Sequence, residues 1–334
     1  MAVYTEVSMD EASVLFNQLQ LGQLQSLVGC AGGIENTNYF ASTDQGEFVL
    51  TLFERLTAEQ LPYYLRLMKH LAVQGIPAPN PATNANGDVL HALNGKPASV
   101  VNRLSGKSEL NPEPTHCAQL GAMLAKMHLA AESFSMRQDN LRGITWWNET
   151  APVILPFLST EETDLLESEL AYQNHVASGA AYTALPRGPI HADLFRDNAL
   201  FDAPPVLGEA SQLSGFFDFY FAGNDALLFD IAVCLNDWCV DLDSGALKLP
   251  QSQALIQAYA SVRPLHPAER QLLPAMARAG ALRFWISRLW DKHLPREASM
   301  LQAHDPGRFE RVLRQRISNP LNIEILFTNP VHAP

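Results

Sequence analysis

The sequence predicts an α+β fold with two lobes: a small N-terminal lobe built on an antiparallel sheet and a larger, mainly helical C-terminal lobe. Short apolar runs separated by glycine- and asparagine-bearing turns fill most of the first hundred residues. Apolar residues at helical spacing dominate the rest. We expect the first lobe at 1–101, a hinge at 102–107 and the second lobe at 108–334.

The composition is that of a globular protein with a large core. The chain has 334 residues, of which 47% are hydrophobic and 17% charged. Its net charge of −12 argues against binding to nucleic acid. The four cysteines are scattered without a C-x-x-C pair, which indicates reduced thiols. No uncharged apolar run approaches the ~18 residues of a membrane span, so we expect a cytoplasmic protein.

The first elements are expected to be a helix and a strand hairpin. Apolar residues recur at helical spacing in MDEASVLFNQLQLGQLQSLVGC (9–30), and Gly32 and Gly33 then break the helix. An extended run resumes at 39–41. GEFVLTLFER (46–55) reads as the second strand of the hairpin.

The first lobe is expected to end with one more helix and two more strands. Residues 58–75 have helical periodicity that stops at Gly75. Two short strands flank the turn Asn94-Gly95. The polar, proline-bearing stretch 105–115 then reads as a linker.

The second lobe is expected to be helical around one polar loop. Helical patterns occupy 115–134, 161–177, 226–242, 250–262, 267–294 and 306–318.

That polar loop, HADLFRDN (191–198), carries the groups needed for phosphoryl transfer. His191, Asp193 and Asn198 match the kinase pattern H-R-D-L-x-x-x-N in register, with Ala192 in place of the arginine. A carboxylate must orient the attacking hydroxyl and accept its proton, which nominates Asp193, with His191, as catalytic.

Twenty residues after the loop, Asp218 stands inside the apolar run FFDFYFAG (216–223). A charge there is costly unless a bound cation offsets it. Mg²⁺ prefers oxygen ligands and takes few carboxylates, so Asn198 and Asp218 are the candidate metal ligands. Alternatively, Asp193 and Asn198 only close a turn and Asp218 pairs with an arginine. The ordered combination favours the metal site.

These motifs resemble the aminoglycoside phosphotransferase and choline kinase superfamily, which has a protein-kinase-like fold. Its members carry H-x-D-x-x-x-x-N followed by an I-D-[FW] strand, here Phe217-Asp218-Phe219. They also carry a later aspartate at a helix start, here Asp230 in LLFDIAVCLNDW. The resemblance implies that Asp230 braces the catalytic loop through hydrogen bonds to its backbone.

Four longer stretches, spread over residues 32–291, resemble the bacterial homoserine kinases of this fold. They are GGIENTNYF, FVLTLFER, the loop with the segment after it, and SVRPLHPAERQLLPAMARAGALRFWISRLWD. This resemblance implies ATP and Mg²⁺ as cofactors and L-homoserine as the small-molecule substrate. The product, O-phospho-L-homoserine, belongs to threonine biosynthesis.

A glycine-bearing loop and the strand after it would cover the nucleotide phosphates. Glycines let backbone amides approach phosphate, and compact polar side chains add donors. The expected residues are Gly32, Gly33, Asn36, Thr37 and Asn38.

The pattern departs from many kinases at the strand lysine that pairs the phosphates. The equivalent position is Thr51, and no lysine lies in 46–56. Arg55 would share the strand face of Thr51 if the strand continued that far, and could supply the missing charge. In the hinge, Asn102 is nominated by position for the adenine.

The acceptor site should offer a cation for the carboxylate of homoserine and an acidic or polar group for its ammonium. Arg283 and Arg288 lie five residues apart, roughly 140° around a helix, so at most one is expected to bind the carboxylate. Asp237 and Tyr220 are the candidates for the ammonium.

Two other functions remain open at this stage. The chain could phosphorylate choline, ethanolamine, an aminoglycoside or another small alcohol. It could also be a pseudokinase scaffold, which the missing lysine suggests. The sequence does not predict the oligomeric state.

Overall fold

A computed structural model describes residues 4–30, 36–204, 210–294 and 304–328. The chain forms two compact units, and each is described by itself. The first comprises Met1–Ser105 with Ser214–Phe217, and the second Gly106–Leu213 with Asp218–Pro334. The predicted α+β fold of a small sheet unit and a larger helical unit is confirmed. The first unit's main segment ends at Ser105, and this unit also takes in four later residues; the hinge at 102–107 stays a prediction.

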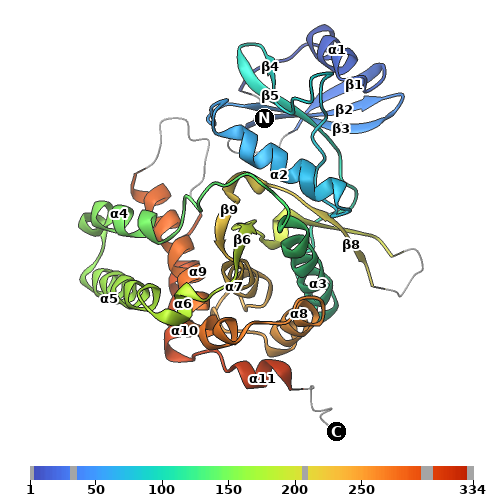
Figure 1. Cartoon of the computed structure of the whole chain (residues 1–334). Coiled ribbons are helices and arrows are strands. Elements are labelled where there is room, and N and C mark those ends of the chain that lie inside the picture. The colour runs from blue at the N-terminus through green and yellow to red at the C-terminus, as the bar shows by residue number, and fades with distance from the viewer. Residues whose placement is uncertain (1–3, 31–35, 205–209, 295–303, 329–334) are drawn as a thin grey trace. The chain divides into compact units, whose positions relative to one another are not determined.

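The first unit is built on a five-stranded antiparallel sheet, with two helices (Figure 1). The strand order is β1-β2-β3-β5-β4. The strands are β1 (Leu24–Gly29), β2 (Asn36–Thr43), β3 (Gly46–Phe53), β4 (His91–Leu93) and β5 (Lys96–Asn102), and the helices are α1 (Met9–Gln18) and α2 (Leu61–Val73).

Alternation along β2 and β3 gives the sheet one buried face. Tyr39, Ala41, Leu50 and Leu52 point to the same side and pack in one core with Phe16 of α1. The turn between β4 and β5 has Asn94 and Gly95 both at positive φ, 50° and 73°. This is the conformation that a two-residue hairpin requires, as the sequence predicted.

The predicted helix at 9–30 is wrong in its second half. Helix α1 starts at a capping box in which Ser8 and Glu11 bond reciprocally, and it ends at Gln18. Gln20 and Gly22 then adopt left-handed φ angles of 57° and 89°, which a helix cannot continue through. The chain re-emerges as β1, whose residues pair with β2.

The second unit holds the remaining helices and two small sheets. Strand β6 (Arg187–Ile190) pairs with β9 (Gly223–Ala226), and β7 (Ala199–Asp202) with β8 (Gln212–Phe216), whose residues from Ser214 on are assigned to the first unit. The helices are α3 (Pro114–Ala131), α4 (Ile144–Ile154), α5 (Thr160–Ala177), α6 (Ala180–Thr183), α7 (Leu227–Trp238), α8 (Leu249–Val262), α9 (Pro267–His293), α10 (Gly307–Ser318) and α11 (Ile323–Phe327). All six helices predicted for this unit are present, and the sequence missed α4, α6 and α11. None of the described helices is long and apolar enough to cross a membrane.

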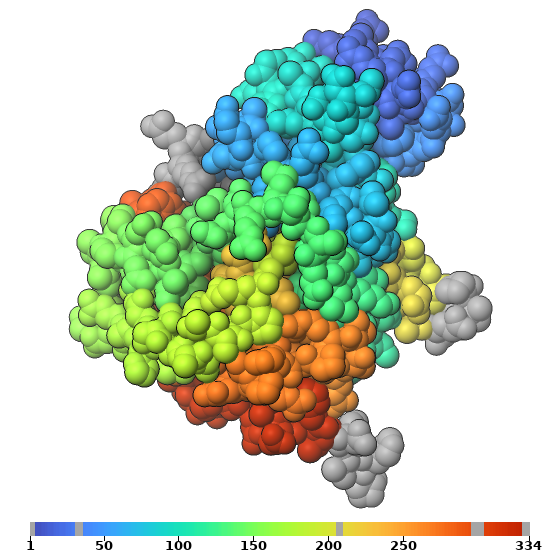
Figure 2. All heavy atoms as spheres, viewed as in Figure 1, coloured from blue at the N-terminus to red at the C-terminus, as the bar shows by residue number. Residues whose placement is uncertain are grey.

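The core of the second unit is organised around α7, in which all twelve residues are buried. Helix α9 packs against it, and α3 and α8 lie side by side (Figure 1). On the face drawn in Figure 2, orange and red atoms from the last third of the chain lie against yellow-green atoms of the α5–α6 region. A buried helix of this kind is a rigid base for side chains that project from it.

The α3–α8 contact depends on Gly121. A Cβ at this position would stand 2.2 Å from the backbone oxygen of Leu255, which cannot move away like a side chain. We predict that Gly121→Ala lowers the free energy of unfolding by about 3 kcal/mol or more. The control is Gly188→Ala, whose nearest neighbour would be a Leu227 methyl group at 3.4 Å. Thermal unfolding of Gly121→Ala at the wild-type temperature would contradict the close approach of α3 and α8.

Candidate functional site

The loop between β6 and β7 is held from below by one buried carboxylate. Asp230 of α7, fully shielded from solvent, accepts hydrogen bonds from His191 N (2.7 Å) and Ala192 N (2.6 Å). Ala192 is left-handed, with φ at 64°. Such a conformation costs about 1–2 kcal/mol in a non-glycine residue, and charge-assisted bonds of this kind offset it.

A second aspartate of α7 holds the other end of the loop. Asp237 Oδ2 accepts from Arg196 N (2.8 Å) and Arg196 Nε (3.1 Å). Its Oδ1 pairs with Arg308 of α10. Asp230 and Asp237 are seven residues apart, two helical turns, so they project from the same face of α7. The loop is therefore pinned to one rigid helix at both ends.

A buried network fixes Asp230 in turn. His128 Nε2 donates to Asp230 Oδ2 (3.1 Å), and its Nδ1 lies 2.7 Å from the Tyr259 hydroxyl. In the middle of the loop, Leu194 O accepts a hydrogen bond from Trp238 Nε1 at the end of α7 (2.9 Å). His128 thus packs beneath the loop and holds Asp230 in place.

The pinned loop presents Asp193 beside a buried cation. Arg283 Nη1 of α9 lies 3.7 Å from Asp193 Oδ1, and the Asp193 side chain is 15% exposed. Asn198 Nδ2 donates to Asp193 O (2.9 Å), which leaves the Asn198 Oδ1 oxygen for another partner. Asp193 is therefore a partly accessible carboxylate, as is needed to bind the hydroxyl group of a phosphate-accepting substrate.

The surroundings raise the affinity of Asp193 for protons. Burial raises the pKa of Asp193 to about 7, although the Arg283 guanidinium opposes this change. Asp218 raises the pKa further, whereas Arg288 lowers it. Asp218 is therefore close to Asp193, and the two carboxylates share one charged environment.

Asp218 stands at a sharp change of chain direction. It follows β8 and caps the short 3₁₀ turn Phe219–Phe221 with left-handed angles of φ 67° and ψ 57°. The next polar residue, Tyr220, lies beside it: burial raises the pKa of the Tyr220 phenol, and Asp218 raises it further. This left-handed conformation is unfavourable for most residues. It changes the direction of the chain at Asp218, within the apolar run 216–223.

The oxygen donors at this site fit a hard divalent cation held by few carboxylates. In the part of the chain that the structure describes, no cluster of three or more His, Cys, Asp or Glu side chains could hold a metal ion. Asn198 offers an amide oxygen and Asp218 a carboxylate, a set suited to Mg²⁺ because this ion keeps several waters. The assignment of both as ligands stays a prediction.

Two predicted roles at this site need correction. Asp237 was expected to contact the acceptor ammonium, but it is buried and occupied by Arg196 and Arg308. His191 was expected to be catalytic, yet it has no exposed surface, and its Nδ1 accepts from Asp193 N (3.3 Å). Both are positioning residues of the loop.

Both arginines of α9 act on Asp193, and the expectation that at most one of them binds the acceptor carboxylate stays a prediction. Arg283 and Arg288 both change the pKa of Asp193, so both reach its surroundings despite their spacing on the helix. Arg288 also lines a hollow of about 280 Å³ with His304, Arg308 and Arg311.

In the first unit, the predicted nucleotide residues divide between the two faces of the sheet. Thr37 points to the core face, is fully buried and donates to Glu54 Oε1 (2.8 Å), so its hydroxyl is not a phosphate donor. Asn36 and Asn38 alternate with it and point to the other face. There Asn38 Oδ1 accepts a hydrogen bond from Thr51 Oγ1 (2.7 Å). Thr51, at the position of the kinase lysine, therefore uses its hydroxyl proton within the sheet.

The other nucleotide predictions rest on segments at the ends of strands. Gly32 and Gly33 lie outside the described residues. Strand β3 ends at Phe53, so the face argument for Arg55 fails. Asn102, the last residue of β5, accepts from Asn80 N through its side chain (2.7 Å).

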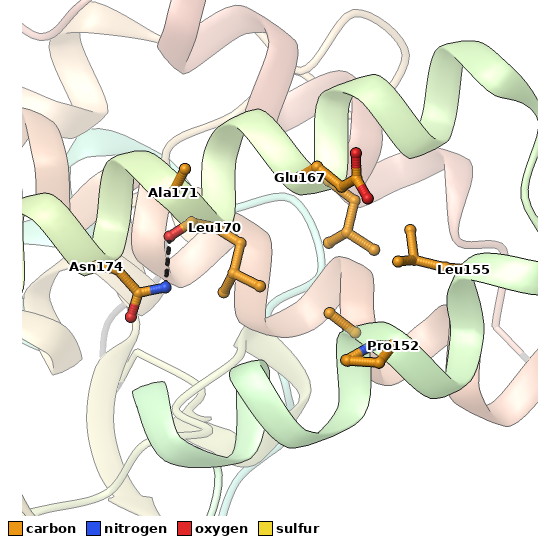
Figure 3. Close-up of a pocket in the computed structure, with 8 residues that line it drawn as sticks. Pro152, Leu155, Glu167, Leu170, Ala171 and Asn174 are labelled. Carbon is orange, nitrogen blue, oxygen red and sulfur yellow. Dashed lines mark hydrogen bonds between the residues drawn. The ribbon is translucent and has the colours of Figure 1, made fainter.

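A hollow of about 400 Å³ between α4 and α5 lacks the combination of carboxylates and arginines found around Asp193. Apart from Glu167 and Asn174, its lining is apolar (Figure 3). The Asn174 amide already donates to Leu170 O (2.9 Å), as the dashed line in Figure 3 marks. The loop from His191 to Asn198 is the better candidate for the active site.

The loop and its helical support are those of a known enzyme family. The model of the phosphotransferase enzyme family matches residues 26–265, well over half of the chain. The chain belongs to this family. The resemblance to phosphotransferases that the sequence motifs indicated is therefore confirmed.

Similar curated proteins cover almost the whole chain. A homoserine kinase of Polaromonas naphthalenivorans (strain CJ2) is 62% identical over 96% of this chain and 99% of that protein. A homoserine kinase of Janthinobacterium sp. (strain Marseille) is 52% identical over 95% of this chain and 96% of that protein.

Solved structures share the fold at low sequence identity. An amicoumacin kinase in complex with AMP-PNP, Ca²⁺ and Ami has a TM-score of 0.69 at 17% identity, covering 95% of this chain and 97% of that chain. A choline kinase from Streptococcus pneumoniae has a TM-score of 0.61 at 13% identity, covering 93% of this chain and all of that chain.

The brace at Asp230 can be tested by a near-isosteric change. We predict that Asp230→Asn destabilises the protein by about 2–4 kcal/mol, because one of the two loop amides then faces an N–H group in place of an oxygen. We expect kcat to fall at least tenfold while the acceptor KM changes less. Thermal unfolding and steady-state kinetics measure this, with the exposed Asp243→Asn as control. Wild-type stability in Asp230→Asn would show that the loop does not depend on this carboxylate.

Proposed function

We propose that this protein is an ATP-dependent kinase that phosphorylates the side-chain hydroxyl of L-homoserine to give O-phospho-L-homoserine. The reaction type follows from the family and from Asp193, a partly accessible carboxylate on a rigidly held loop. The choice of L-homoserine as the acceptor rests on the 62% identity to a homoserine kinase over almost the full length of both chains. The substrate is therefore a small molecule, and the product feeds threonine biosynthesis, which we place in the cytoplasm.

Asp193 would act on the acceptor hydroxyl. The hydroxyl oxygen forms a bond to the γ-phosphorus, the bond from that phosphorus to the β–γ bridging oxygen breaks, and ADP leaves. The hydroxyl proton passes to Asp193. A base with a pKa near neutrality, here about 7, is well matched to this proton transfer.

Asn198 and Asp218 would hold the divalent cation, for which we propose Mg²⁺. Bound there, the ion would offset the charge of the β- and γ-phosphates and would cancel part of the repulsion between Asp218 and Asp193. In the first unit, backbone amides and the side chains of Asn36 and Asn38, on the sheet face opposite to Thr37, would be the donors for phosphate oxygens.

The pseudokinase alternative rests on Thr51, which replaces the strand lysine and bonds to Asn38. A scaffold does not need a pinned loop that keeps a carboxylate accessible beside two arginines. We therefore favour an active enzyme.

Replacement of Asp193 separates chemistry from nucleotide binding. We predict that Asp193→Asn lowers homoserine-dependent ADP release by about 10²-fold or more, since the proton acceptor is lost. The affinity for Mg²⁺-ATP, measured by calorimetry, should change less than about threefold. The matched control is Asp197→Asn, an exposed neighbour on the same loop.

The same coupled ADP assay, run with L-homoserine, choline, ethanolamine and an aminoglycoside, tests the acceptor. L-Homoserine should give the highest kcat/KM. Faster turnover of another alcohol would overturn the proposed substrate, and wild-type turnover in Asp193→Asn would remove Asp193 from the mechanism.

A further inference from the structure

Arg283 is a buried guanidinium with an unused edge. Its side chain is 4% exposed, and Nη1 is the nitrogen that lies 3.7 Å from Asp193 Oδ1. Within the described part of the chain, neither Nε nor Nη2 has a hydrogen-bond partner. Burying charged donors without partners is strongly unfavourable, so the arrangement indicates a ligand that completes it.

Two other buried arginines of the second unit, Arg196 and Arg316, use most of their donor nitrogens within the fold. Arg196 donates to the Asp237 side chain and to the backbone oxygens of Leu110 and Asp237. Arg316 donates through Nε to Asn236 Oδ1 (2.9 Å) and through Nη1 to Gly245 O (3.2 Å). Arg316 Nη2 and Arg308 Nε each lack a partner as well, so Arg283 differs from the other described arginines in having two buried, unpartnered nitrogens, Nε and Nη2.

The two unused donors of Arg283 lie on one edge of the planar group. The Nε–H and Nη2–H bonds on this edge run parallel, which is the geometry that binds both oxygens of a carboxylate. Nη1 stands on the opposite side and faces Asp193. The rings of Phe284 and Phe221, 3.7 Å and 5.1 Å from Cζ, contact the guanidinium, and this leaves the edge as the place for an anion.

The local charge also favours an anion. Burial lowers the pKa of Arg283 to about 10, Asp193 opposes this, and Arg142 and Arg288 lower the pKa further. Arg142 and Arg288 therefore both lie within electrostatic reach of Arg283, where Asp291 opposes their effect, and a ligand carboxylate would relieve the repulsion on Arg283.

We propose that the Nε–Nη2 edge of Arg283 binds the α-carboxylate of the acceptor, so that one guanidinium selects an amino-acid alcohol and sets its hydroxyl against Asp193. In L-homoserine a short, flexible carbon chain joins the two groups, which suits a cation placed directly beside the catalytic carboxylate. The inference rests on the proposed function and deepens it. A phosphate oxygen pair offers the same bidentate chemistry, so the experiment must separate the acceptor from the nucleotide.

The test compares two acceptors that differ only in the carboxylate: L-homoserine and 3-amino-1-propanol. In Arg283→Met, kcat/KM for L-homoserine should fall by about 100-fold or more, because a site built to bind a charged group loses it. For 3-amino-1-propanol the change should stay within about threefold, since this acceptor has no carboxylate to lose. Arg283→Lys should recover part of the rate with L-homoserine.

Direct binding gives a second measurement that does not depend on turnover of the poorer acceptor. By calorimetry, Arg283→Met should bind L-homoserine at least about 30-fold more weakly and AMP-PNP with unchanged affinity. The control is Arg316→Met, an equally buried arginine, which should lower the melting temperature and leave the ratio of the two acceptors unchanged.

Each outcome decides between assignments. An equal loss of kcat/KM with both acceptors, or a parallel loss of affinity for AMP-PNP, would overturn the proposal. Arg283 would then act on the nucleotide phosphate or on Asp193 alone. A change of ratio in Arg288→Met, with none in Arg283→Met, would overturn it in favour of Arg288. A wild-type protein inactive on L-homoserine but active on another alcohol would refute the proposed function, whatever the result at Arg283.

Discussion

The site depends on two carboxylates that project from one face of a buried helix. Asp230 and Asp237 of α7 accept backbone N–H groups from the two ends of the loop His191–Asn198. A loop with a left-handed alanine would not hold its shape by local preferences alone. All residues of α7 are buried, so the helix is a rigid support for the loop bonded to it. Asp193 is thereby held in place although its side chain is still partly exposed.

Opposite charges are then distributed around this fixed carboxylate. Burial, the largest cause, and Asp218 make Asp193 harder to ionise, whereas Arg283 and Arg288 make it easier. The balance leaves the Asp193 pKa at about 7, where the group can accept a proton from an alcohol. Arg283 also has two donor nitrogens without a partner among the described residues, so one of the groups that lower the Asp193 pKa also offers a place for an anionic substrate.

Much of this could be predicted from the sequence, and the misses have physical causes. The spacing of the motifs nominated Asp193, Asn198 and Asp218, whose roles stay a prediction, and the structure shows Asp193 partly exposed beside Arg283. The end of the first helix was missed because Gln20, a non-glycine, adopts a left-handed φ that no propensity anticipates. Asp237 was misplaced because its partner Arg308 is distant in sequence. Thr37 was misassigned because a polar residue next to a glycine loop can still point to the core.

The central claim is that Asp193, Asn198 and Asp218 converge around one divalent ion that faces an alcohol. A crystal structure with Mn²⁺, AMP-PNP and L-homoserine tests it most directly, because the anomalous signal locates the ion. The account predicts an ion bound to the Asn198 amide oxygen and the Asp218 carboxylate, with the homoserine hydroxyl hydrogen-bonded to Asp193. An ion held by other side chains, or a hydroxyl beyond hydrogen-bond reach of Asp193, would contradict it.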